Sequence, residues 1–119
     1  MEKIVEQGLL YDFYGELLTE HQRKVYEDSV YNDLSLSEIA EDMGISRQGV
    51  HDLIKRCDHA LWEYEEKLHL VRKFLTIKEK MQNIKVTVDV LCDGSIEADK
   101  KEILLQSIKE LSEEVLKEL

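Results

Sequence analysis

The chain has 119 residues, of which 43% are hydrophobic and 35% are charged, and its net charge is −10. This length suits one domain with an appended segment, and the absence of proline favours helices throughout. No apolar run reaches the roughly 18 residues that a membrane-spanning helix needs, and the first residues lack the layout of a signal peptide. We therefore expect a soluble, cytoplasmic protein.

Charge is distributed unevenly along the chain. Residues 1–45 carry 3 basic and 11 acidic groups, residues 46–80 carry 8 and 6, and residues 81–119 carry 5 and 9. An evenly acidic surface would repel nucleic acid. Any contact with nucleic acid is therefore expected in the middle segment, the only one with a net positive charge.

Two amphipathic helices are predicted before residue 32. Apolar side chains recur at helical spacing over residues 4–18, and Tyr11 is expected on the outward face. Thr19 and Gln22 have the spacing of a capping box, which predicts a second helix that ends near Tyr31. The side chains expected in the core are Leu9, Leu10, Phe13, Tyr14, Leu17, Val25, Tyr26 and Val30.

Residues 35–57 predict a helix-turn-helix motif. Ser35 and Glu38 form a second capping box before a helix over residues 36–43, Gly44 suits the left-handed conformation that ends it, and Ser46 suits the N-cap of the next helix. The alternative, an ordinary helical hairpin, is disfavoured by the short glycine-containing turn. The expected core positions are Ile39, Ala40, Met43, Ile45, Val50 and Leu53.

After Arg47 no helix-stopping signal occurs before Asp93-Gly94-Ser95, so one long helix is predicted. Its apolar residues follow a heptad-like pattern with one slip near Phe74. A last amphipathic helix is expected to fold back as a hairpin. Because a hairpin has little core of its own, we expect a homodimer that completes a bundle.

The predicted fold is therefore all-α. A helix-turn-helix domain is expected over residues 1–60. A helical dimerisation region, continuous with the second helix of the motif, is expected over residues 61–119.

Catalytic and metal-binding patterns are absent from the sequence. His51 and His59 are eight residues apart, and no further ligand type converges on them. Neither Cys57 nor Cys92 has a metal-ligand neighbour at a useful spacing, and both are interpreted as small buried thiols in a reducing compartment. No phosphate-binding loop or nucleophile elbow occurs. We expect neither enzyme activity nor a cofactor.

The second helix of the motif carries candidate nucleic-acid contacts. In such motifs the first residues of this helix face base edges, and Arg47 suits guanine whereas Gln48 suits adenine. The remaining candidates would hold phosphates or flank them. The alternative is an inherited scaffold with solvated side chains, which Asp52 on the same face favours. The six candidates are Ser46, Arg47, Gln48, His51, Lys55 and Arg56.

Several short stretches carry a family resemblance in combination: Asp12-Phe13-Tyr14, Leu17-Leu18-Thr19, Gln22, Leu36-Ser37-Glu38-Ile39-Ala40-Glu41, Ser46-Arg47-Gln48, Ile54-Lys55-Arg56 and Tyr64-Glu65-Glu66-Lys67-Leu68. They resemble region 4 of bacterial sigma factors and, more closely, the YlxM-type family of helix-turn-helix proteins, over roughly residues 8–70. That family typically has alanine where this chain has Gly49, and commonly tyrosine where it has His51. The resemblance implies a sigma-region-4-like fold and an association with the signal recognition particle pathway.

Two functions follow from these observations. The first is a regulatory or accessory protein of that pathway that contacts DNA or RNA through the helix-turn-helix. The second is a protein–protein adaptor whose motif is only a scaffold and whose acidic surface docks on a basic partner. Steep salt dependence of binding would distinguish the first from the second.

Overall fold

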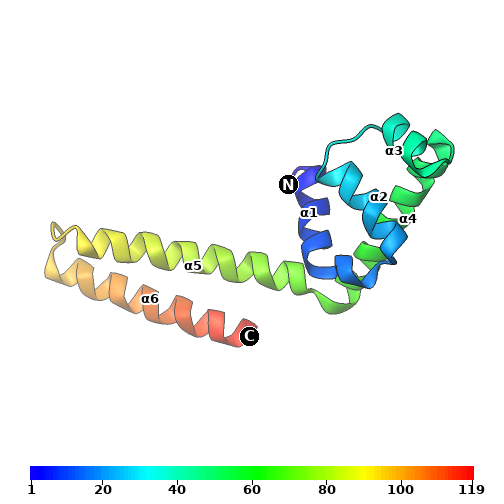
Figure 1. Ribbon diagram of the computed structural model, residues 1–119. Helices are drawn as coiled ribbons and strands as arrows, with labels where there is room; N and C mark the ends of the chain where they lie inside the picture. The colour runs from blue at the N-terminus through cyan, green and yellow to red at the C-terminus, as the bar shows by residue number, and fades with distance from the viewer. The chain divides into compact units, whose positions relative to one another are not determined.

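The computed structural model describes residues 1–119 and is all-α (Figure 1). It forms two compact units, Met1–Val71 and Arg72–Leu119. None of the helices has both the length and the apolar character that crossing a membrane requires. The elements are α1 (Lys3–Tyr14), the 3₁₀ turn η1 (Gly15–Leu17), α2 (Glu20–Val30), α3 (Leu36–Met43), α4 (Arg47–Leu68), α5 (Leu70–Cys92) and α6 (Ala98–Glu118).

Both predicted capping boxes are present in the first unit. Oγ1 of Thr19 accepts from the Gln22 amide at 3.2 Å, and Oε1 of Gln22 accepts from the Thr19 amide at 3.0 Å. Ser35 and Glu38 make the same reciprocal pair at the start of α3. These bonds satisfy amide groups that a helix start leaves free, so they set where α2 and α3 begin.

The turn of the helix-turn-helix also follows its sequence signals. Gly44 ends α3 in the left-handed conformation, with φ of 67°, which costs glycine nothing because it has no Cβ. The predicted bounds of α3 and the predicted start of α4 are confirmed. The motif core combines buried Val25, Ile39, Ala40 and Val50, with Met43 and Leu53 packed at its edge.

Some predicted core positions are wrong. Ile45 is 40% exposed because it lies in the turn between α3 and α4. Leu17 is 56% exposed because the α-helix ends at Tyr14 and the 3₁₀ turn redirects the following side chains. Phe13 is also exposed, on the flank of α1.

Tyr11 was expected to face outward, and this prediction is also wrong. Its ring stacks on that of Tyr26, with centroids 5.6 Å apart, and its hydroxyl donates to the Glu27 carboxylate. Burial first, and then this hydrogen bond, raise the pKa of Tyr11 to about 12. A polar-tipped aromatic residue on the helix flank therefore joins α1 to α2.

The expectation of one uninterrupted helix after Arg47 is wrong at a single residue. His69 adopts the left-handed conformation, with φ of 56°, and ends α4; α5 begins at the next residue. The amide of Leu70 donates to the Tyr14 hydroxyl at 3.1 Å, and the amide of Val71 donates to Oε1 of Glu65 at 3.0 Å. The Tyr14 hydroxyl from α1 and the Glu65 carboxylate from α4 thus accept from amides that the break leaves without a helical partner.

In the second unit, α5 and α6 run side by side in opposite directions (Figure 1). The predicted break is present: α5 ends at Cys92, and Gly94 has φ of 75°. One ion pair joins the helices, between Nζ of Lys80 and Oε2 of Glu114 at 3.4 Å. Cys57 is buried as expected, but Cys92 is exposed because it lies at the end of the hairpin. The dimerisation role assigned to this region stays a prediction.

Candidate nucleic-acid interface

One side of α4 is buried, and this determines which of its residues face the solvent. Val50, Cys57 and Leu61 lie along this face and have no exposed surface. Two hydrogen bonds then hold α1 against α4: Gln7 donates to Asp58 at 3.0 Å, and Tyr14 donates to Glu65 at 2.6 Å. Both pairs are 51 residues apart in sequence, so the two helices run in the same direction and present the opposite side of α4 to solvent.

The first turn of α4 is held by Ser46. Its Oγ accepts from the Gly49 amide at 2.9 Å, as an N-cap does. A Cβ on residue 49 would lie 3.1 Å from this oxygen, so Gly49 leaves room for the cap. The amides of the first helical residues, Arg47 and Gln48, carry the positive end of the helix dipole, a setting that favours anions.

Five of the six predicted contact residues are exposed, and the structure gives three of them no carboxylate partner. His51 is the exception in exposure, because part of its ring packs against the protein. Arg47, Lys55 and Arg56 form no ion pair, so their charges are free to meet a phosphate or a base. The exposed five are Ser46, Arg47, Gln48, Lys55 and Arg56.

Asp52 interrupts this cationic surface. It accepts a hydrogen bond from Nε2 of Gln48 at 3.0 Å, the usual pairing of side chains four residues apart on a helix. Nδ1 of His51 lies 3.8 Å from the same carboxylate and makes no hydrogen bond. Asp52 therefore orients Gln48 and reduces the positive potential at the centre of the site.

The pocket beside α4 includes a residue from α1 that no local sequence pattern predicts. His51 and Lys55 line a pocket of about 330 Å³ together with Lys3 from α1 and Ser29 from α2. Lys3 lies far from α4 in sequence and reaches this pocket because α1 and α4 run in the same direction. The alignment of α1 with α4 is held by hydrogen bonds between residues 51 positions apart in sequence. No local sequence pattern predicts this alignment.

Asp58 also lines this pocket and joins α1, α2 and α4 through hydrogen bonds. It accepts from Gln7 and, at 2.5 Å, from the Tyr26 hydroxyl. Burial and this bond raise the pKa of Tyr26. Burial, followed by the neighbouring Asp58 charge, raises the pKa of the Cys57 thiol to about 11, so this thiol stays protonated at neutral pH.

The exposed first turns of α4 offer groups that suit binding. No group of three or more His, Cys, Asp or Glu side chains is placed to hold a metal ion. The exposed groups at the start of α4 and its N-cap include guanidinium, ammonium, amide and hydroxyl groups, together with the Asp52 carboxylate. These groups suit contacts with phosphates and base edges.

Comparisons with known proteins agree with the helix-turn-helix reading of the fold. The family model of UPF0122, described as "Putative helix-turn-helix protein, YlxM / p13 like", matches residues 1–103. The match extends beyond residues 8–70, over which the sequence resembles the YlxM-type family. A UPF0122 protein of Thermoanaerobacter sp. (strain X514) is 42% identical over 107 residues, covering 90% of this chain and 88% of its own. One from Acetivibrio thermocellus is 42% identical over 116 residues, or 98% of both chains. One from Halalkalibacterium halodurans is 47% identical over 89 residues, or 75% of this chain and 82% of its own.

Proposed function

We propose that this chain, which belongs to the UPF0122 family of YlxM- and p13-like helix-turn-helix proteins, is a non-enzymatic protein that binds nucleic acid through the first turns of α4. One observation carries the proposal. Arg47, Lys55 and Arg56 are exposed on α4 without carboxylate partners, whereas the opposite side of the same helix is buried.

Two kinds of contact are expected from this surface. Arg47 and Gln48 would meet base edges, because the N-terminal residues of the second helix occupy that position in helix-turn-helix complexes. Lys55, Arg56 and the Ser46 hydroxyl would meet phosphates, which fix the register without reading sequence. His51 and Lys3 border the adjoining pocket and would extend the phosphate contacts.

The overall charge limits how this protein would bind. With a net charge of −10, the protein as a whole repels nucleic acid, and the exposed cations of this surface oppose that repulsion locally. We therefore expect weak non-specific binding even at low salt. A homodimer would present two surfaces to one ligand, and the gain would depend on their separation. For this reason the proposal includes a homodimer.

The family resemblance supports a place in the signal recognition particle pathway, as a regulatory or accessory protein in the cytoplasm. Both DNA and the RNA of the particle are candidate ligands. Duplex DNA offers base edges in a major groove wide enough for a helix. RNA is recognised mostly in loops and bulges whose bases are unstacked. Separate DNA and RNA arms in a binding experiment therefore distinguish the two.

One observation favours a second function, that of a protein–protein adaptor. Residues 1–45 contain 11 acidic and only 3 basic side chains. These residues include α1, α2 and α3 of the first unit, so a basic partner protein would find a complementary surface there. In this reading the helix-turn-helix would serve only as a scaffold.

Capture of partners from a cell lysate, with and without nuclease treatment, separates the two functions. For a nucleic-acid binder we expect DNA or RNA in the untreated sample and loss of associated proteins after nuclease. For an adaptor, the same protein would be recovered in equal amount from both samples. Recovery of a basic protein in both samples, with no nucleic acid in either, would favour the adaptor function and contradict nucleic-acid binding.

A further inference from the structure

The pocket beside the start of α4 is built by four helices of the first unit and will be called the α4 pocket. Residues of α1, α2, α3 and α4 line it, and its volume is about 330 Å³. This volume is at the lower end of the range of about 300–1,000 Å³ that small-molecule pockets have, so it suits one small ligand group. His51 and Lys55 line this pocket and also belong to the six residues predicted to contact nucleic acid, so the pocket adjoins that surface.

The lining of the α4 pocket combines apolar side chains with hydrogen-bond acceptors. Its apolar side chains are Ile4, Leu36 and Ile54. Oδ1 of Asp58 accepts from Gln7 and Tyr26, whereas Oδ2 accepts only from Gln7, at 3.2 Å. A carboxylate has about four acceptor sites, so Asp58 can accept a further hydrogen bond. Proteins hold a base that has left its stack through apolar contacts to its faces and hydrogen bonds to its edge.

Two lysines from different helices bring positive charge to this pocket. Lys3 of α1 and Lys55 of α4 are both exposed, and neither forms an ion pair. Asp58 is the one carboxylate in the lining; it is partly covered and already accepts hydrogen bonds from its neighbours. The lining therefore has an excess of positive charge, which favours the phosphates on either side of a nucleotide.

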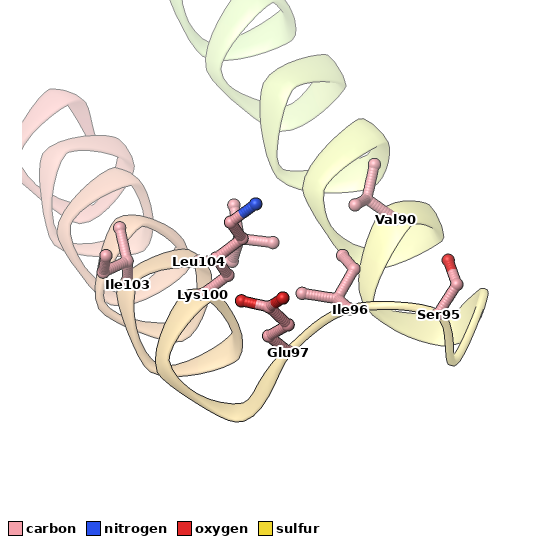
Figure 2. A pocket seen from close by; sticks show the side chains of 7 residues that line it. All are labelled: Val90, Ser95, Ile96, Glu97, Lys100, Ile103 and Leu104. Atoms are coloured by element: carbon pink, nitrogen blue, oxygen red, sulfur yellow. The ribbon is translucent and has the colours of Figure 1, made fainter.

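The pocket at the turn of the α5–α6 hairpin lacks this excess of positive charge. Its volume is about 410 Å³, and Val90 of α5, Ile96 of the turn and Leu104 of α6 lie around one space (Figure 2). The two charged residues in its lining, Glu97 and Lys100, have opposite signs. The lining of that pocket thus has no net charge that would attract an anion.

We infer that the α4 pocket receives the base of one unpaired nucleotide, while Lys3 and Lys55 contact the phosphates beside it. The inference rests on the proposed function, in which α4 binds nucleic acid, and it specifies the kind of nucleic acid that is preferred. A base in a continuous duplex must lose its stacking and pairing before it can enter a pocket, and this cost is least for a base that is already unpaired. The protein should therefore prefer a bulge or a loop to a continuous duplex.

Duplexes with and without a single bulged adenine nucleotide test this preference. Each is made in RNA and in DNA, so that the two sources of an unpaired base are compared, and each is titrated with the full chain at the same salt concentration. For at least one of the two nucleic acids, we expect the parent to bind the bulged duplex about tenfold or more tightly than the continuous one.

A matched pair of serine variants links this preference to the pocket. Ser29 of α2 lines the α4 pocket, so Ser29→Leu fills part of the space without changing its charge. This variant should bind bulged and continuous duplexes equally. Ser112 is exposed on α6, and the control Ser112→Leu should keep the preference of the parent.

Loss of folding must be separated from loss of base binding. Helix content by circular dichroism and the emission of Trp62, the single tryptophan, report whether a variant is folded. If Ser29→Leu is unfolded, Ile4→Glu takes its place, because Ile4 lines the pocket and is 48% exposed. Its added carboxylate should repel the phosphates beside the inserted base and remove the preference. Val5 is 50% exposed and does not line the pocket, so Val5→Glu is the charge-matched control.

The possible results separate this inference from the proposed function. Equal binding of bulged and continuous duplexes by the parent would overturn the inference and leave the proposed function intact. A preference that survives in the folded pocket variant, or that is lost in its control, would do the same. If the parent binds none of the duplexes, the proposed function fails and the inference fails with it.

Discussion

The hydroxyl of Tyr14 donates to Oε1 of Glu65 over 2.6 Å, and both side chains are buried. The same two oxygens accept from the amides of Leu70 and Val71 at the start of α5. The end of α1 therefore supplies hydrogen bonds to the junction between α4 and α5. This network allows His69 to take a left-handed conformation, which side chains other than glycine adopt at a cost.

Removal of the Tyr14 hydroxyl should destabilise the first unit. Tyr14→Phe leaves the buried Glu65 carboxylate and the Leu70 amide each short of one partner, so we expect a loss of about 1–3 kcal/mol in unfolding free energy. Urea unfolding followed by Trp62 fluorescence measures this change. Tyr64→Phe is the control, because the Tyr64 ring packs near that of Tyr14 while its hydroxyl makes no hydrogen bond. Equal stability of the two variants would contradict the role given to the network.

Ala40 lies where α3 packs in the motif core, and it is only 9% exposed. Ala40→Leu inserts three carbon atoms between helices that are already in contact with Val25, Ile39 and Val50. We expect a loss of about 1–3 kcal/mol, because an overpacked core must shift its backbone or strain its side chains. Thermal unfolding of Ala40→Leu and of the exposed control Glu41→Leu gives the comparison. A parental midpoint for Ala40→Leu would mean that the helices do not cross there.

Asp28 should make stability dependent on pH in the acid range. Its buried carboxylate accepts from Asn32 at 2.9 Å and from Lys24 at 3.0 Å, and the Asn32 bond contributes most to lowering its pKa below 3.8. A lowered folded-state pKa stabilises the fold above about pH 4, and this contribution is lost as the pH falls through the folded-state value. Asp28→Asn should therefore cost about 1–2 kcal/mol at pH 7 and progressively less below pH 4.

Urea unfolding of the parent and Asp28→Asn at pH 7, 5 and 3 measures this dependence. Asp42→Asn serves as the control, since Asp42 is exposed and has no ion-pair or hydrogen-bond partner in the structure. The difference between the parent and Asp28→Asn should narrow toward pH 3. A constant difference across the three pH values would show that the charge of Asp28 does not contribute.

Features that depend on local sequence were predictable. The capping boxes at Thr19 and Ser35, the left-handed Gly44 and the break before Gly94 each depend on residues a few positions apart, whose preferences act in any helical context. The same holds for the exposed start of α4, because Ser46 caps it and the periodicity of Val50 and later apolar residues sets its buried side.

Features that depend on distant residues were not predictable. Nothing near His69 in sequence forbids a continuous helix; the break depends on Tyr14, which lies more than 50 positions away in the chain. The prediction that Tyr11 faces outward failed because its partners, Tyr26 and Glu27, belong to α2. Lys3 was overlooked as a neighbour of Lys55 for the same reason. Tertiary hydrogen bonds override local preference at these positions, as they commonly do.

The central claim is that α4 binds nucleic acid through its exposed cations. Its most direct test is a titration of labelled duplex DNA, and of the RNA of the signal recognition particle, at two salt concentrations. The proteins compared are the parent, the Arg47→Ala/Lys55→Ala double variant and a charge-matched control, Lys101→Ala/Lys109→Ala on α6. We expect salt-sensitive binding by the parent and the control. In the double variant, loss of the Arg47 contact should weaken the binding free energy by about 1–3 kcal/mol. Loss of Lys55 should lower the slope of the logarithm of the binding constant against the logarithm of the salt concentration by about one. Equal binding by all three proteins, or no binding by any, would contradict the claim.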